Sequence, residues 1–120
     1  MALRTARTSI YIDAVKFFNI AYEGQFEMDK RDRIVLANRL LDHTEQFIAF
    51  FSLTYNTEKK AENVDKMFSE FECIKFLCRF AIENHKFKKQ TTINSITESI
   101  VKMDEGIIKW RNYIYSASQV

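Results

Sequence analysis

The chain has 120 residues, of which 47% are hydrophobic and 28% are charged, and its formal net charge at pH 7 is +2. This length is typical of one domain with its own core, so we expect a single domain over residues 1–120. Two glycines and no proline argue against a β-sandwich or β-barrel, which needs many tight turns, and favour a few long helices.

The first residues of the sequence, Met1 to Arg7, lack the apolar core of a signal peptide. No apolar run approaches the roughly 20 residues that a membrane-spanning helix requires. We therefore expect a cytoplasmic protein. Cys73 and Cys78 are five residues apart on a predicted helix, which is too far for a disulfide, so we expect two reduced cysteines in the core.

The first predicted helix covers about residues 9–23, with short flexible ends expected over 1–7 and 117–120. Thr8 or Ser9 can cap its free amide groups, and Gly24 suits its carboxyl end. Its apolar positions include Ile10, Ala14, Phe17, Phe18 and Ala21.

Asp29 is the predicted N-cap of a second, longer helix that runs to about residue 55. Large apolar residues recur at intervals of three and four, which predicts one buried face. The main row reads Ile34, Ala37, Leu41, Ile48, Phe51 and Tyr55, with Thr44 in the remaining position, and Leu36, Leu40, Phe47 and Phe50 widen it.

The third predicted helix covers about residues 58–84 and is followed by a short basic connection over 85–90. Its expected buried face holds Val64, Met67, Phe71, Ile74, Cys78 and Ala81, broadened by Phe68 and Phe80. The fourth helix opens at Thr91 or Thr92 and runs to about residue 116. It carries a ladder with gaps of 3, 4, 3, 4, 3 and 4, typical of a bundle seam: Ile93, Ile96, Ile100, Met103, Ile107, Trp110 and Ile114.

Four helices with short loops predict an all-α fold, an antiparallel up-down-up-down four-helix bundle. Eleven phenylalanines, with neighbours such as Phe17 and Phe18, indicate either a wide buried stripe or a second apolar face that meets another subunit. The small residues Ser95, Ser99 and Gly106 form a groove beside the ladder. A helix of the same subunit or of another subunit would fill it.

Catalytic and metal-binding signatures are absent from the sequence. His43 has no second histidine at i+4, and His43, His85 and the two cysteines show no zinc-ligand spacing. The two glycines are too far apart for a phosphate-binding loop, and no nucleophile motif occurs. We therefore expect no enzyme activity, no cofactor, no metal and no catalytic residue.

Basic residues form two groups. Lys75, Arg79 and Lys86 lie at i, i+4 and i+11 on one predicted helical face, which Lys88 and Lys89 extend into the loop. A second group, at the start of the second helix, comprises Arg31, Arg33 and Arg39. These groups form either an ordinary solvated surface or a nucleic-acid-binding surface. Phe87, among the loop lysines, either stacks on a base or plugs the end of the bundle.

Several segments resemble the Avd-type accessory proteins of diversity-generating retroelements. The opening resembles theirs through Thr8-Ser9-Ile10-Tyr11, Phe26, Lys30-Arg31-Asp32-Arg33 and Arg39-Leu40-Leu41-Asp42. Residues 71–81 resemble the family's Leu-x-x-Leu-Arg-x-Leu-Leu-Arg-Leu-Ala, Lys88-Lys89-Gln90 is similar to its Lys-Gln, and Trp110 falls on its terminal tryptophan. Residues 102–109 also resemble the four-helix bundle proteins encoded in intervening sequences of ribosomal RNA genes.

The resemblance implies a non-catalytic homopentamer of four-helix bundles. It would bind RNA, or an RNA/DNA hybrid, and a reverse transcriptase, and so support mutagenic retrohoming. Lys75 and Arg79 carry over by position as nucleic-acid-binding residues, whereas Arg31, Arg33 and Arg39 match the family's basic segment more loosely. The alternatives are a ribosomal intervening-sequence protein with an undefined RNA-associated role and a purely structural homo-oligomer.

Overall fold

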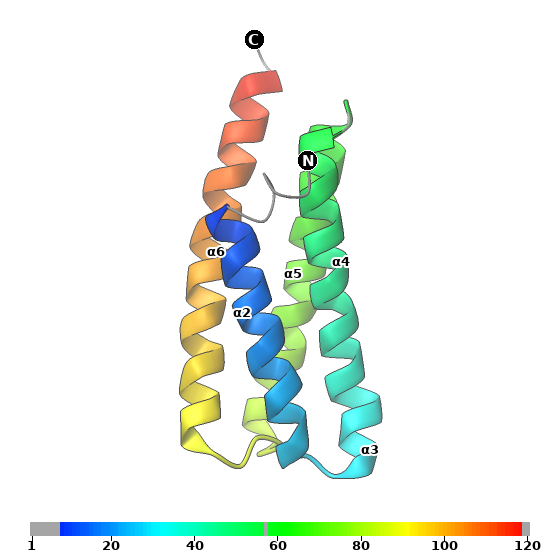
Figure 1. Cartoon of the computed structure of the whole chain (residues 1–120), viewed down its shortest axis with the longest axis vertical. Coiled ribbons are helices and arrows are strands. Elements are labelled where there is room, and N and C mark those ends of the chain that lie inside the picture. The colour runs from blue at the N-terminus through cyan, green and yellow to red at the C-terminus, as the bar shows by residue number, and fades with distance from the viewer. Residues whose placement is uncertain (1–7, 57, 119–120) are drawn as a thin grey trace.

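The computed structural model of the chain describes residues 8–56 and 58–118. These residues form an all-α structure with no strand among them, which confirms the all-α part of the predicted fold. Figure 1 shows long helices lying side by side along one axis. The predicted flexible end over 1–7 lies outside the described residues, whereas residues 117 and 118 belong to the last helix.

Helix α2 (Ser9–Gly24) leads through a 3-10 turn, η1 (Gln25–Glu27), to a long composite rod. This rod consists of α3 (Lys30–Asp32), a π-helical segment η2 (Arg33–Ala37) and α4 (Asn38–Asn56). The remaining helices are α5 (Lys60–Glu83) and α6 (Gln90–Ser118). The predicted helices agree with these bounds to within two residues, and α6 begins just before the expected Thr91 or Thr92.

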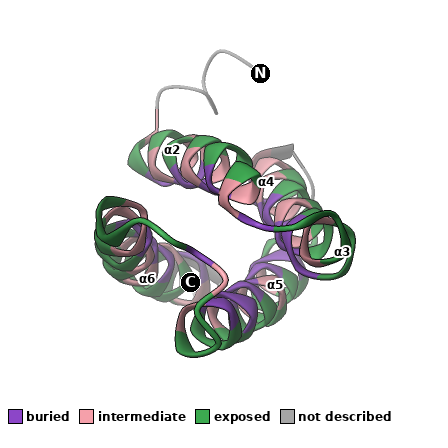
Figure 2. Cartoon of the chain, turned by 90° about the horizontal axis from the view of Figure 1, so that it is seen from below, coloured by how far each residue is buried: buried purple, intermediate pink, exposed green. Residues whose placement is uncertain are grey.

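The helices enclose a single interior. Helix α4 packs on α5, α2 packs on α6, and further contacts join α5 to α6 and α2 to α4. Figure 2, which looks along the helices, shows their buried residues turned toward the space that they surround and their exposed residues turned outward. No helix among the described residues is long and apolar enough to cross a membrane.

The predicted ladder on α6 lies in this interior. Ile96, Met103, Ile107 and Ile114 are buried, and Ile93, Ile100 and Trp110 are partly buried against the core. The Trp110 indole Nε1 donates a hydrogen bond to Thr54 Oγ1 at 3.0 Å, which satisfies its polar atom within the aromatic end of the core. The alternating spacing therefore identified the buried face of α6 correctly.

Ile34 departs from the predicted pattern because it is 58% exposed. It lies in the π-helical segment, where the amide of Asn38 bonds to the carbonyl of Arg33, five residues earlier. The wider turn changes the rotation per residue, so Ile34 no longer shares a face with Leu41. Leu36 and Ala37 occupy the interior at this level instead.

Phe80 and Cys73 were also expected in the core, and both are exposed. The buried stripe of α5 continues through Ile74, Leu77 and Cys78, which leaves these two positions on the outer side of the helix. Burial raises the pKa of the Cys78 thiol to about 12. The expectation of two core cysteines is therefore correct only for Cys78.

Local interactions fix the helix ends. Thr8 Oγ1 accepts from the Tyr11 amide at 3.4 Å, and Asp29 Oδ1 accepts from the Asp32 amide at 2.8 Å, so both are N-caps as predicted. Beyond α5, the amide of Lys86 bonds to Ala81 O and that of His85 to Ile82 O. These two bonds form a Schellman turn, with His85 at φ 58° where glycine is usual.

The two glycines serve close packing. Gly24 has φ −64°, so it does not form the left-handed helix end that glycine usually provides. A Cβ on Gly24 would lie 2.9 Å from Phe87 Cε1, and a Cβ on Gly106 would lie 3.2 Å from Ile10 Cγ1. The small-residue groove on α6 is therefore occupied, around Gly106, by α2 of the same chain.

We predict that Ile107→Ala lowers the free energy of unfolding by about 2–5 kcal/mol, because Ile107 is fully buried. Ile100→Ala should cost clearly less, since Ile100 is only partly buried. Urea denaturation of both variants measures the difference. Equal losses would show that the two positions are buried to the same extent.

We predict that Gly24→Ala destabilises the protein by about 1–3 kcal/mol, because the new methyl group would overlap the Phe87 ring. Gly106→Ala is the matched control. The methyl group of the new alanine would lie close to Ile10, but alanine favours the helix over glycine by about 1 kcal/mol, which offsets that contact. The melting temperature of the Gly106→Ala variant should therefore stay close to that of the parent. A larger loss at Gly106 than at Gly24 would contradict this packing.

Candidate nucleic-acid interface

The predicted basic residues do not form one surface. Arg31, Arg39 and Lys86 line a groove of about 480 Å³ between the composite rod and α5. Lys75 and Arg79 line a different groove, between α5 and α6. Lys88 and Lys89 line a third hollow, at the end of the bundle. The predicted common face of Lys75, Arg79 and Lys86 is therefore wrong.

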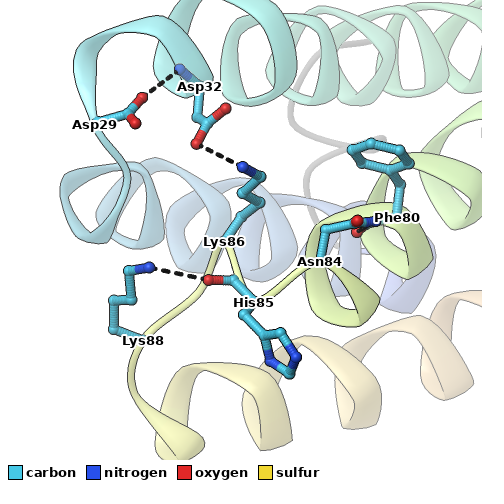
Figure 3. A network of polar contacts seen from close by, with 7 residues as sticks. All are labelled: Asp29, Asp32, Phe80, Asn84, His85, Lys86 and Lys88. Atoms are coloured by element: carbon cyan, nitrogen blue, oxygen red, sulfur yellow. Dashed lines mark hydrogen bonds and ion pairs between the residues drawn. The ribbon is translucent and has the colours of Figure 1, made fainter.

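Lys86 is separated from Lys75 and Arg79 because α5 ends before it. The helix stops at Glu83, and the left-handed His85 turns the chain before Lys86. Lys86 Nζ then forms an ion pair with Asp32 Oδ2 at 3.2 Å, and Lys88 Nζ donates to His85 O at 3.1 Å. Figure 3 shows this network at the junction of α3 with the loop that follows α5.

The groove between the composite rod and α5 combines cations with exposed aromatic rings, and we call it the α4–α5 groove. Phe76 and Phe80 of α5 line it and are 61% and 40% exposed, with ring centroids 6.3 Å apart. Within the described part of the chain, Arg31 and Arg39 have no ion-pair partner. Their charges are therefore available to a ligand.

The groove between α5 and α6 carries less available charge. Lys75 Nζ lies 2.8 Å from Glu72 Oε1 and 3.8 Å from Asp104 Oδ1, and it sits 5.0 Å from the centre of the Phe71 ring. Arg79 is exposed and has no ion pair with a described residue. Of the two residues that the family resemblance favours most, Arg79 has the freer charge.

Arg33 is held by the first loop. Its Nε donates to Gln25 O at 3.1 Å, and its guanidinium lies 5.5 Å from the centre of the Phe26 ring. Although Arg33 is close in sequence to Arg31, it does not line the α4–α5 groove. Its contacts connect the composite rod to η1.

Glu27 organises the loop that carries Lys88 and Lys89. Its Oε1 accepts hydrogen bonds from the amides of Lys88 and Lys89 at 2.7 and 2.8 Å, and its Oε2 accepts from the Thr92 hydroxyl. Burial raises the pKa of Glu27, but the Thr92 hydroxyl and the two amides lower it more, so the net shift is downward. The carboxylate also lies at the positive end of α6.

Phe87, between the loop lysines, is buried and packs against Gly24. It therefore plugs the end of the bundle and presents no ring to a nucleic-acid base. The exposed rings in the candidate interface are instead those of Phe76 and Phe80. Sequence reasoning did not select Phe76, although its spacing of four from Phe80 and its place outside the buried rungs of α5 would have identified it.

Polar side chains elsewhere form pairs. His43 Nδ1 bonds to Glu70 Oε2 across α4 and α5. In the described ranges, no group of three or more histidine, cysteine, aspartate and glutamate side chains is placed to hold a metal ion.

Comparisons with protein-family models, curated proteins and solved structures return no match to this chain.

We predict that Glu27→Gln lowers the free energy of unfolding by about 1–2 kcal/mol at pH 7, because it removes the charge of a partly exposed carboxylate that accepts three hydrogen bonds. Since the pKa of Glu27 is lowered on folding, its contribution is complete above its ordinary pKa and is lost as the pH falls through the lowered value. Parent and variant stabilities, measured by urea denaturation from pH 7 to pH 3, should therefore converge in acid. A constant difference would contradict the role of the charge.

Proposed function

We propose that the protein is a non-catalytic accessory protein of the Avd type. It assembles as a homo-oligomer, binds RNA or an RNA/DNA hybrid together with a reverse transcriptase, and supports mutagenic retrohoming of a diversity-generating retroelement in the cytoplasm. The observation that carries the proposal is the presence of arginines without ion pairs among the described residues, exposed beside aromatic rings on an all-α scaffold. The scaffold that we propose is the antiparallel up-down-up-down four-helix bundle.

The electrostatic part of the proposal rests on Arg31, Arg39 and Arg79. Guanidinium groups without acidic partners can bind phosphates through paired hydrogen bonds. Lys88 and Lys89 are exposed in the adjoining loop and add two ammonium groups. Lys75 and Lys86 contribute less, because each already pairs with a carboxylate of the same chain.

Self-association is supported by apolar side chains outside the core. Besides Phe76 of the α4–α5 groove, the described residues include four large hydrophobic side chains that are more than half exposed: Phe26, Ile34, Val101 and Tyr113. Where exposed apolar side chains join into one contiguous patch, they typically mark an interface. The pentamer follows from the family resemblance. The same observation also fits the alternative of a purely structural homo-oligomer, and an RNA-associated protein of the ribosomal intervening-sequence type is the other alternative.

We predict that the parent protein binds structured RNA with an affinity that falls linearly with the logarithm of salt concentration. Arg79→Glu and the double variant Arg31→Glu with Arg39→Glu should each weaken binding and reduce the salt slope by about 1 for each phosphate contact removed. Filter binding across a salt series measures both effects. Lys109→Glu, an exposed change of equal charge on α6, should behave as the parent does.

Two further measurements separate the alternatives. Under the proposal, a reverse transcriptase encoded nearby co-purifies after nuclease treatment, and light scattering gives five subunits. A homo-oligomer that retains no RNA at low salt would instead support the purely structural alternative. A monomer that retains neither partner would overturn the proposal.

A further inference from the structure

The α4–α5 groove has the composition of a protein-docking site. It is lined by exposed Val35 on one side and by exposed Phe76 and Phe80 on the other. Aromatic residues and arginine are enriched at protein interfaces, whereas lysine is depleted. An aliphatic side chain such as Val35 offers no flat surface to a nucleic-acid base, but it packs well against another side chain.

The shape of the groove fits a helix. Phe76 and Phe80 are four residues apart on α5, and Val35 and Arg39 are four residues apart on the composite rod. Side chains at this spacing form parallel ridges along the two helices. A third helix can therefore place its own apolar ridge between them, as in other helix-in-groove complexes.

The charges at the rim define the chemistry of that helix. Lys86 is neutralised by Asp32, and the Asp29 carboxylate caps α3. Arg31 and Arg39 have no acidic partner within the described residues. Covering them without a counter-charge would be costly, so the partner must supply carboxylates. The two arginines are eight positions apart, roughly 12 Å along a helix.

The backbone gives an independent reason to select this groove. The π-helical segment Arg33–Ala37 lies along it and leaves Val35 47% exposed. Single π-helical turns within α-helices occur frequently at functional sites.

We infer that the α4–α5 groove is the docking site for an acidic amphipathic helix of a partner protein. The helix places an apolar stripe against Val35, Phe76 and Phe80 and two carboxylates, about two turns apart, on Arg31 and Arg39. The inference extends the proposed function by assigning the surface that receives its protein partner. It rests on that proposal only for the identity of the partner.

The test uses a fluorescent synthetic helix of about 18 residues, with a leucine stripe and two flanking glutamates eight positions apart. Anisotropy titration should show saturable binding to the parent protein. Phe76→Ser should weaken it at least tenfold, whereas Phe76→Leu should keep it within about threefold, because leucine preserves apolar contact. Both substitutions lie at a mostly exposed position, so neither should unfold the protein.

A charge exchange makes the test specific. The double variant Arg31→Glu with Arg39→Glu should no longer bind the acidic peptide. It should instead bind a second peptide that has lysines in place of the two glutamates. Arg79→Glu, which lies in the other groove, should bind the acidic peptide as the parent does. A parent protein that binds the acidic peptide but retains no RNA at low salt would overturn the proposed function and leave this inference standing.

Three outcomes would overturn the inference. In the first, the two peptides bind the parent equally or not at all. In the second, single-stranded oligouridylate displaces the peptide and is itself lost in Phe76→Leu, which would identify a base-stacking surface. In the third, sedimentation shows self-association that Phe76→Ser abolishes, which would assign the groove to a second copy of the chain.

Discussion

The binding of the Glu27 carboxylate to the loop before α6 is the interaction on which the arrangement of the surface depends. It joins η1 to the amides of Lys88 and Lys89 and to the Thr92 side chain, so the first and last connections are held together. Phe87 is packed against Gly24 at the same end. In this arrangement the loop after α5 brings Lys86 to Asp32.

The interior was largely predictable from the sequence because large apolar residues repeat at helical spacing. Ile96, Met103 and Ile107 are buried as expected. That reasoning assumes a constant rotation per residue, and it failed where the assumption fails, at the π-helical turn that exposes Ile34. It also failed for Phe80, where hydrophobicity alone suggested a wider buried stripe than α5 has.

The candidate site was predicted less completely than the core, because it depends on how the chain turns. If α5 continued as far as Lys86, the sequence spacing would put Lys86 on the same helical face as Lys75 and Arg79. The helix instead ends at Glu83, and His85 turns the backbone. A histidine at a position that usually holds glycine gives no sequence signal for such a turn. The role of Glu27 was missed for a related reason, since its partners are more than sixty residues away in the sequence.

Ion pairs within the chain decide which lysines and arginines have charge available to bind a partner. Sequence counts each lysine and arginine as one positive charge, yet Lys75 and Lys86 are paired with Glu72 and Asp32. A phosphate or carboxylate from a partner would have to displace those acids, whereas a guanidinium with no ion pair to a described residue gains one at no such cost. Recognition by this protein should therefore depend on its arginines more than on its lysines, and Arg31 and Arg39 lie on a different groove from Arg79. An acidic helix bound at Arg31 and Arg39 would therefore compete with RNA for those two charges, whereas Arg79 would stay open to RNA.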